Sequence, residues 1–206
     1  MSLRVVNLGL PKSGTTTLAH ALRSAGLRVA DYRIRKDQSD GDRLRGAFVA
    51  PMLYRGYFET GDPGAELQEF DAITEMSLVR RGKSLWPQMD YGLIAALRDH
   101  HPGIRFLASN RDALKLSQSM AGWSDLGTRR LPDASIPGLP AGFGATDAER
   151  VRWINGHYAH LRALFGNDPS FLEYDVADED AAAKIGAHLG MQLPWWGRVN
   201  VNRKAG

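Results

Sequence analysis

Apolar and polar residues along the chain follow two different periods. Short apolar runs rich in β-branched residues precede longer segments whose apolar residues recur every three or four positions. The runs predict buried strands, for example at 3–8, 104–109 and 171–176, and the longer segments predict helices. A repeated strand-then-helix order is typical of a mostly parallel sheet covered on both faces. The pattern therefore predicts a three-layer α/β fold.

The same pattern gives the other expected elements. Strands are expected at 27–30 and 70–74, and helices at 48–58, 89–97, 113–120 and 178–189. Two more helices are expected: one follows the glycine-rich loop at 9–16 and ends at Gly26, and the other runs from the capping box Thr146–Glu149 to Gly166. The charged segment 33–46 is expected to cross the surface. The Gly- and Pro-rich segment 122–146 is expected to have no regular element and to form a mobile lid or loop. No linker interrupts the pattern, so residues 1–206 are expected to form one domain.

Composition limits the classes of function. The 206 residues are 43% hydrophobic and 24% charged, with a net charge of +3 and no cysteine. These values fit a soluble domain with an anionic ligand, but the excess of positive charge is too small to indicate nucleic-acid binding. The absence of cysteine gives no support to secretion. The first ten residues lack a long apolar segment. A cytoplasmic protein with no membrane or nucleic-acid partner is expected.

The residues between the first strand and the first helix carry the strongest chemical signal. They read Gly9-Leu10-Pro11-Lys12-Ser13-Gly14-Thr15-Thr16. A glycine-rich turn at a helix N-terminus directs backbone N–H groups and the helix dipole toward an anion. Nucleotide triphosphatases place a lysine directly after the second glycine, where Thr15 stands here. Lys12, two residues before that glycine, suits a 5′-phosphate and the bond leaving it.

This loop resembles the 5′-phosphosulfate loop of the sulfotransferases that use PAPS (3′-phosphoadenosine-5′-phosphosulfate), which reads Pro-Lys-Ser-Gly-Thr-Thr. All six residues are present as Pro11 to Thr16. The resemblance implies a P-loop-like sulfotransferase fold, PAPS as co-substrate, adenosine 3′,5′-bisphosphate as product, and no metal. The nucleotide would contact Pro11, Lys12, Ser13, Gly14, Thr15, Thr16 and Thr17. A Leu-Glu-Tyr-Asp strand after the helix that ends at Phe165 is also typical of bacterial members of this family.

A second match lies at the end of a central strand, where this family binds the 3′-phosphate. Arg111 and Ser119 have the family's spacing of eight positions. A guanidinium and a hydroxyl are suited to hold a phosphate. The family's Asn-Pro after the arginine is absent, and Ser117 offers a competing hydroxyl. The resemblance further implies a basic C-terminal segment over the nucleotide, for which Arg203 and Lys204 are candidates.

Transfer to an alcohol requires a general base, because a neutral hydroxyl is a weak nucleophile. Many family members have a histidine at a strand end in a Thr-His context, and Glu75 follows Thr74 in the comparable stretch here. Glu75 is therefore the candidate base, with Asp71 and Asp90 as further candidates. His20, His100, His101, His157 and His160 are interpreted as structural.

The acceptor is expected to be a small molecule or glycan. Trp86, Trp123, Tyr54, Tyr57 and Phe58 are candidates to line its pocket, although the aromatic residues within 48–58 are interpreted first as core. Two alternative functions stay open. One is a P-loop small-molecule kinase that uses ATP, and the other is a non-catalytic nucleotide-binding homologue.

Overall fold

A five-stranded sheet lies at the centre of the computed structural model, which describes residues 3–80, 82–197 and 199. Its strands are β1 (Val5–Asn7), β2 (Val29–Asp31), β3 (Ala72–Glu75), β6 (Arg105–Asn110) and β7 (Phe171–Asp175), in the order β2-β3-β1-β6-β7. All four pairings within it are parallel. The predicted parallel sheet is confirmed.

Helices cover both faces of this sheet. They are α1 (Thr15–Ser24), α2 (Val49–Thr60), α3 (Tyr91–His100), α4 (Ala113–Ala121), α6 (Asp147–Phe165) and α7 (Ala181–Leu189). Neighbouring residues of β1 point into different cores, because Val5 packs with side chains of α1 and α7 while Val6 belongs to the cluster that includes α3 and α6. Side chains alternate across a strand, so these two clusters lie on opposite faces. The three-layer α/β fold is confirmed.

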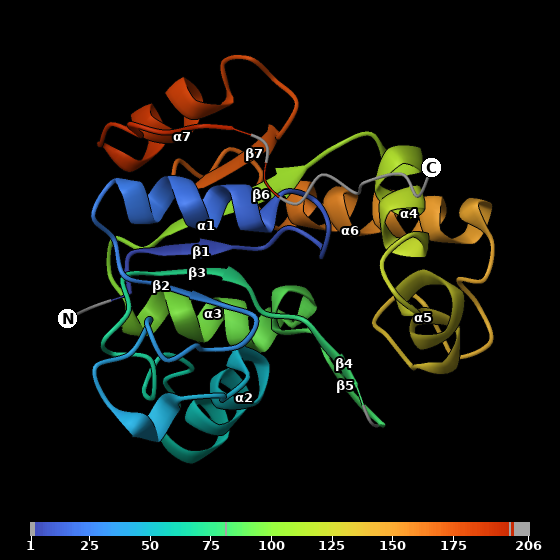
Figure 1. Cartoon of the computed structure of the whole chain (residues 1–206), viewed down its shortest axis with the longest axis horizontal. Helices are drawn as coiled ribbons and strands as arrows, with labels where there is room; N and C mark the ends of the chain where they lie inside the picture. The colour runs from blue at the N-terminus through green and yellow to red at the C-terminus, as the bar shows by residue number, and fades with distance from the viewer. Residues whose placement is uncertain (1–2, 81, 198, 200–206) are drawn as a thin grey trace.

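The structure adds elements that the sequence pattern did not predict. An antiparallel hairpin of β4 (Leu78–Arg80) and β5 (Lys83–Leu85) projects from the body (Figure 1). Its strands have three residues each and contain arginine and lysine, so they lack an apolar run. Short 3₁₀ turns occupy Asp42–Leu44 and Pro87–Met89.

The segment 122–146 is more regular than expected. It contains a π-helical turn at Leu126–Arg130 and the short helix α5 (Leu131–Asp133). Leu126, Leu131, Ile136 and Leu139 are buried in the main core. The expectation of a segment without regular structure is therefore wrong over 126–133, because these apolar side chains fix the backbone. Its movement as a lid stays a prediction.

Helix α2 also differs from the interpretation of its aromatic residues as core. Met52 and Leu53 are fully buried, and Tyr54 and Tyr57 are partly buried against the core, but Phe58 is 78% exposed. The interpretation is wrong for Phe58. Within the described part of the chain, no helix combines the length and the apolar character needed to cross a membrane.

The parallel sheet determines where a ligand can bind. The carboxyl ends of parallel strands lie on one edge of a sheet, and ligands of open α/β folds bind outside that edge. Residues 9–16, the predicted phosphate loop, follow β1, Arg111 follows β6, and Glu75 is the last residue of β3. The fold thus brings together residues that are far apart in the sequence.

Candidate functional site

The loop between β1 and α1 has the backbone shape of an anion cradle. Lys12 and Gly14 both have left-handed backbone angles, with φ of 72° and 109°. Gly14 is the N-cap of α1 and has no side chain that could cap the helix. A Cβ at Gly14 would lie 2.5 Å from Cγ2 of Val176, so only glycine fits. The N–H groups of the first helical turn are left to an incoming anion.

Buried hydrogen bonds hold this loop against the neighbouring strand β6. Oγ of Ser13 lies 2.6 Å from Oγ of Ser109, which also accepts a hydrogen bond of 3.1 Å from Nδ2 of Asn7. The Tyr158 hydroxyl donates to the carbonyl of Ser109 at 2.7 Å. A Cβ at Gly9 would lie 2.2 Å from Oγ of Ser109. The Ser13 side chain therefore points inward and positions the loop, and a contact between the backbone N–H of Ser13 and the nucleotide stays a prediction.

A cavity of about 1270 Å³ opens beside the loop. Nine of the predicted site residues line it: Pro11, Lys12, Gly14, Thr15, Thr16, Thr17, Glu75, Arg111 and Ser119. Ligand pockets of proteins have volumes of about 300–1000 Å³, so this cavity has room for a nucleotide and more. The structure thus brings both predicted phosphate sites and the candidate base to one cavity.

The Lys12 ammonium lies over an aromatic ring in this cavity. Its Nζ is 3.6 Å from the ring centroid of Trp123, a cation–π contact. Burial lowers the pKa of Lys12 from its ordinary value, the Arg111 charge lowers it further, and Glu75 opposes both. Nη1 of Arg111 lies 3.5 Å from the carbonyl oxygen of Lys12. Lys12 and Arg111 are therefore close enough to serve one ligand.

Glu75 is a buried carboxyl group connected to the phosphate loop. It is 9% exposed, and its Oε1 accepts hydrogen bonds from N and Oγ of Ser77 at 3.0 and 2.6 Å. Burial raises the pKa of Glu75 to about 7, although hydrogen bonds from Ser77 and Thr15 oppose this shift. A carboxyl group with this pKa can take up or release a proton near neutral pH, as a general base must.

The two candidate serines of α4 have different surroundings. Ser117 is buried, and its hydroxyl lies 2.5 Å from Oδ1 of Asp147 and 2.8 Å from Nε of Arg150. Ser119 is half-buried and lines the cavity. The Ser117 hydroxyl is therefore part of a structural network, and the Ser119 hydroxyl is the one at the cavity. Arg203 and Lys204 lie outside the described residues.

Other candidates lie away from this cavity. Trp86 and Trp123 are part of its lining, but Tyr54, Tyr57 and Phe58 of α2 are not, so these three do not share a cavity with Lys12. Asp71 accepts a hydrogen bond from the backbone of Arg28, and Asp90 caps α3. Neither lines the cavity.

His157 has a structural environment. It is buried, its Nε2 lies 2.8 Å from the carbonyl oxygen of Leu8, and burial lowers its pKa to about 4. His160 is exposed. Within residues 3–80, 82–197 and 199, no group of three or more His, Asp or Glu residues is placed to hold a metal ion.

The sequence interpretation missed one wall of the cavity. Tyr32, Arg33, Ile34, Arg35, Lys36, Arg45 and Gly46 line it, although the segment 33–46 was expected only to cross the surface. A single signal pointed there, which was the concentration of charge directly after a strand. It identifies no ligand until the order of the strands is known.

Comparison with known proteins gives a likeness of fold. No family model and no curated protein matches the chain. Among solved structures, an unliganded sugar kinase from Janibacter sp. HTCC2649 aligns with 93% of this chain and 96% of its own, at 18% identity and a TM-score of 0.49. This likeness concerns the path of the chain and assigns no activity.

Proposed function

We propose that this protein is a PAPS-dependent sulfotransferase that moves a sulfuryl group to a hydroxyl or amine. The observation that supports this most is the convergence of Lys12, Arg111 and Ser119 on one cavity that also contains Glu75. PAPS carries a 5′-phosphosulfate and a 3′-phosphate, so its binding requires two anion sites. The loop 9–16 provides one such site, and the guanidinium of Arg111 with the hydroxyl of Ser119 provides the other.

In the proposed reaction the acceptor oxygen or nitrogen attacks sulfur, and the bond from sulfur to the bridging oxygen of the 5′-phosphate breaks. Negative charge grows on the departing oxygen, where the Lys12 ammonium and the N–H groups of the loop stabilise it. Glu75 takes the proton of the acceptor hydroxyl. The products are the sulfated acceptor and adenosine 3′,5′-bisphosphate, and Glu75 afterwards returns its proton to solvent.

The second candidate is a P-loop small-molecule kinase that uses ATP. Gly9 and Gly14 have the spacing G-x-x-x-x-G, and Thr16 stands where such kinases place the hydroxyl that binds Mg²⁺. The likeness to a sugar kinase, at a TM-score of 0.49, does not decide between the two candidates. Against this candidate, Thr15 replaces the lysine, and Asp112 caps α4 by accepting a hydrogen bond of 2.9 Å from N of Lys115.

Two labelled donors distinguish these candidates. The protein is incubated with a panel of phenols, sugars and amines, together with either ³⁵S-labelled PAPS or γ-³²P-labelled ATP and Mg²⁺. We expect acceptor-dependent formation of adenosine 3′,5′-bisphosphate and ³⁵S-labelled product, both lost in Lys12→Met. Transfer of ³²P with no turnover of PAPS would overturn the proposal in favour of a kinase.

A further inference from the structure

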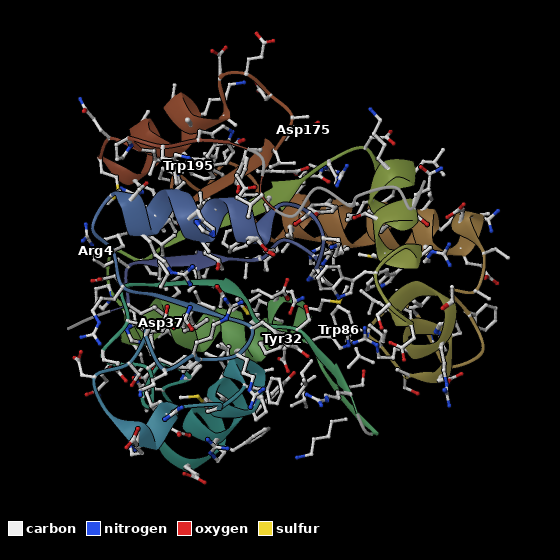
Figure 2. The ribbon with its side chains drawn as sticks, viewed as in Figure 1. Arg4, Tyr32, Asp37, Trp86, Asp175 and Trp195 are labelled. Carbon is white, nitrogen blue, oxygen red and sulfur yellow. The ribbon has the colours of Figure 1, made fainter. Side chains whose placement is uncertain are left out.

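The cavity has two sides that the strand order separates. From the phosphate loop after β1, the strands β6 and β7 lie one way, and β3 and β2 lie the other way. Arg111, Ser119 and Lys115 approach from the β6 side, where the nucleotide of the proposed function binds. Figure 2 shows Asp175 on the β7 side of β1, with Tyr32 and Trp86 on the other. The side of β3 and β2, which includes Glu75, is therefore the acceptor side.

This acceptor side is rich in positive charge. Its cavity-lining cations are Arg33, Arg35, Lys36, Arg45 and Arg130. Two acidic side chains, Asp31 and Glu75, line the same side. The carboxylate of Asp31 already pairs with Arg23 at 2.7 Å. The positive charges on this side thus exceed the negative charges that face them.

Several of these cations have no neutralising partner in the part of the chain that the structure describes. Arg130 pairs with Asp125 at 2.7 Å, and Arg45 lies 3.9 Å from the exposed Asp42. Among the described residues, no carboxylate lies within 4 Å of Arg33, Arg35 or Lys36.

Side-chain and backbone contacts hold residues 33 and 34 next to residues 46–48. Nε of Arg33 donates a hydrogen bond of 3.0 Å to the carbonyl of Gly46, and its guanidinium lies 5.5 Å from the ring centroid of Phe48. The backbone N–H of Ile34 donates to Ala47, and the N–H of Gly46 donates back to Ile34. The cations at 33, 35 and 36 therefore stand on a stretch that is fixed to the start of α2.

We infer that the acceptor is an anionic molecule, which carries a carboxylate, phosphate or sulfate group beside the hydroxyl or amine that receives the sulfuryl group. A cavity lined by charges of one sign concentrates ligands of the opposite sign and raises their association rate by about 10- to 1000-fold. Arg33, Arg35 and Lys36 bind the fixed anion, and Glu75 faces the reacting group. This inference rests on the proposed function, because that function defines which side holds the acceptor.

A matched pair of probes tests the charge preference. With the nucleotide side saturated by adenosine 3′,5′-bisphosphate, calorimetry compares 4-hydroxyphenylacetate with 4-hydroxyphenylacetamide, which differ in charge and little in shape. We expect the carboxylate to bind at least about tenfold more tightly. Added salt is expected to reduce the difference, because the cations at the mouth are exposed. Equal affinities, or no binding of either probe, would overturn the inference.

Two double variants locate the effect. Arg35→Gln with Lys36→Gln is expected to remove about tenfold of the preference for the carboxylate. The control is Arg4→Gln with Arg43→Gln, which removes the same charge from two exposed residues that do not line the cavity. A similar loss in both would show a general effect of net charge and would contradict the inference.

The same titrations separate this inference from the proposed function. If the parent protein fails to bind adenosine 3′,5′-bisphosphate, the sulfotransferase proposal fails. If the bisphosphate binds but the two probes bind alike, the anionic acceptor fails alone.

Discussion

Replacing Glu75 by glutamine changes the stability of the protein in a pH-dependent manner. The carboxyl group is buried, and its pKa is raised from 4.5 to about 7, first by burial. The folded state therefore holds the proton more tightly than the unfolded chain does. For an acid with a raised pKa, this favours the folded state at low pH, and that contribution is lost as the pH rises from about 4.5 to about 7. Glutamine carries no such charge.

The size of the effect follows from the shift. One pKa unit corresponds to about 1.4 kcal/mol, so the ionised carboxylate costs about 3 kcal/mol of folding free energy above pH 7. Most of it, about 2 kcal/mol, falls between pH 5 and pH 8.5. We expect Glu75→Gln to gain about this much relative to the parent over that range, while the introduced amide keeps an oxygen that accepts from Ser77.

Urea denaturation at pH 5 and pH 8.5 measures this gain as a difference between variant and parent. The difference cancels the titration of groups common to both proteins, such as His157, whose lowered pKa has the opposite sign of effect. Glu179→Gln serves as a control, because Glu179 is exposed. It is expected to show no comparable dependence on pH.

The reasoning would be refuted by a Glu75→Gln difference that stays constant within about 0.5 kcal/mol between the two pH values, given the link between protonation and stability. Glu75 would then titrate in the folded protein as it does in the unfolded chain. The same variant is expected to lower the rate of transfer by a factor of about 10² to 10⁴. The parent rate is expected to rise with pH through about 7, where Glu75 ionises.

Three further variants have expected outcomes. Lys12→Met is expected to slow single-turnover sulfuryl transfer by about 10²-fold or more, whereas equal loss of adenosine 3′,5′-bisphosphate affinity would assign Lys12 to binding alone. Arg111→Gln is expected to weaken the binding of that bisphosphate by about 2 kcal/mol in calorimetry and to leave the binding of adenosine 5′-monophosphate unchanged. Equal weakening of both ligands would show that Arg111 does not hold the 3′-phosphate. Arg150→Met is expected to lower the free energy of unfolding, measured in urea, by about 3 kcal/mol. The reason is that Arg150 is buried and donates hydrogen bonds to Ser117, Asp147 and three carbonyl oxygens. An unchanged urea midpoint would show that this network adds no stability.

The phosphate loop could be predicted because its signal is local. The order of β1, loop and α1, the two glycines and Lys12 all lie within one short stretch, and the backbone angles of Lys12 and Gly14 agree with a tight turn. The capping box of Thr146 and Glu149 is equally local, and the structure contains both of its hydrogen bonds.

The acceptor side could not be predicted, because it depends on which strands become neighbours. Arg35 and Lys36 line the cavity only because β2 pairs with β3, 43 residues further along at the Val29–Ala72 contact. Likewise, the sequence gives Ser119 the expected spacing from Arg111 but leaves Ser117 as a competing hydroxyl. The two serines differ in the structure, because the Ser117 hydroxyl is buried and accepts a hydrogen bond from Arg150. The inward contact of the Ser13 hydroxyl could not be predicted for the same reason, since its partner Ser109 is on another strand.

Titration with three nucleotides tests the central claim most directly. Calorimetry measures the binding of adenosine 3′,5′-bisphosphate, adenosine 5′-monophosphate and ATP to the parent protein under one set of conditions. If Lys12 and Arg111 hold two separate phosphates, the bisphosphate binds most tightly, and removal of its 3′-phosphate costs about 2 kcal/mol. Tighter binding of ATP than of the bisphosphate would contradict the assignment of PAPS as the donor.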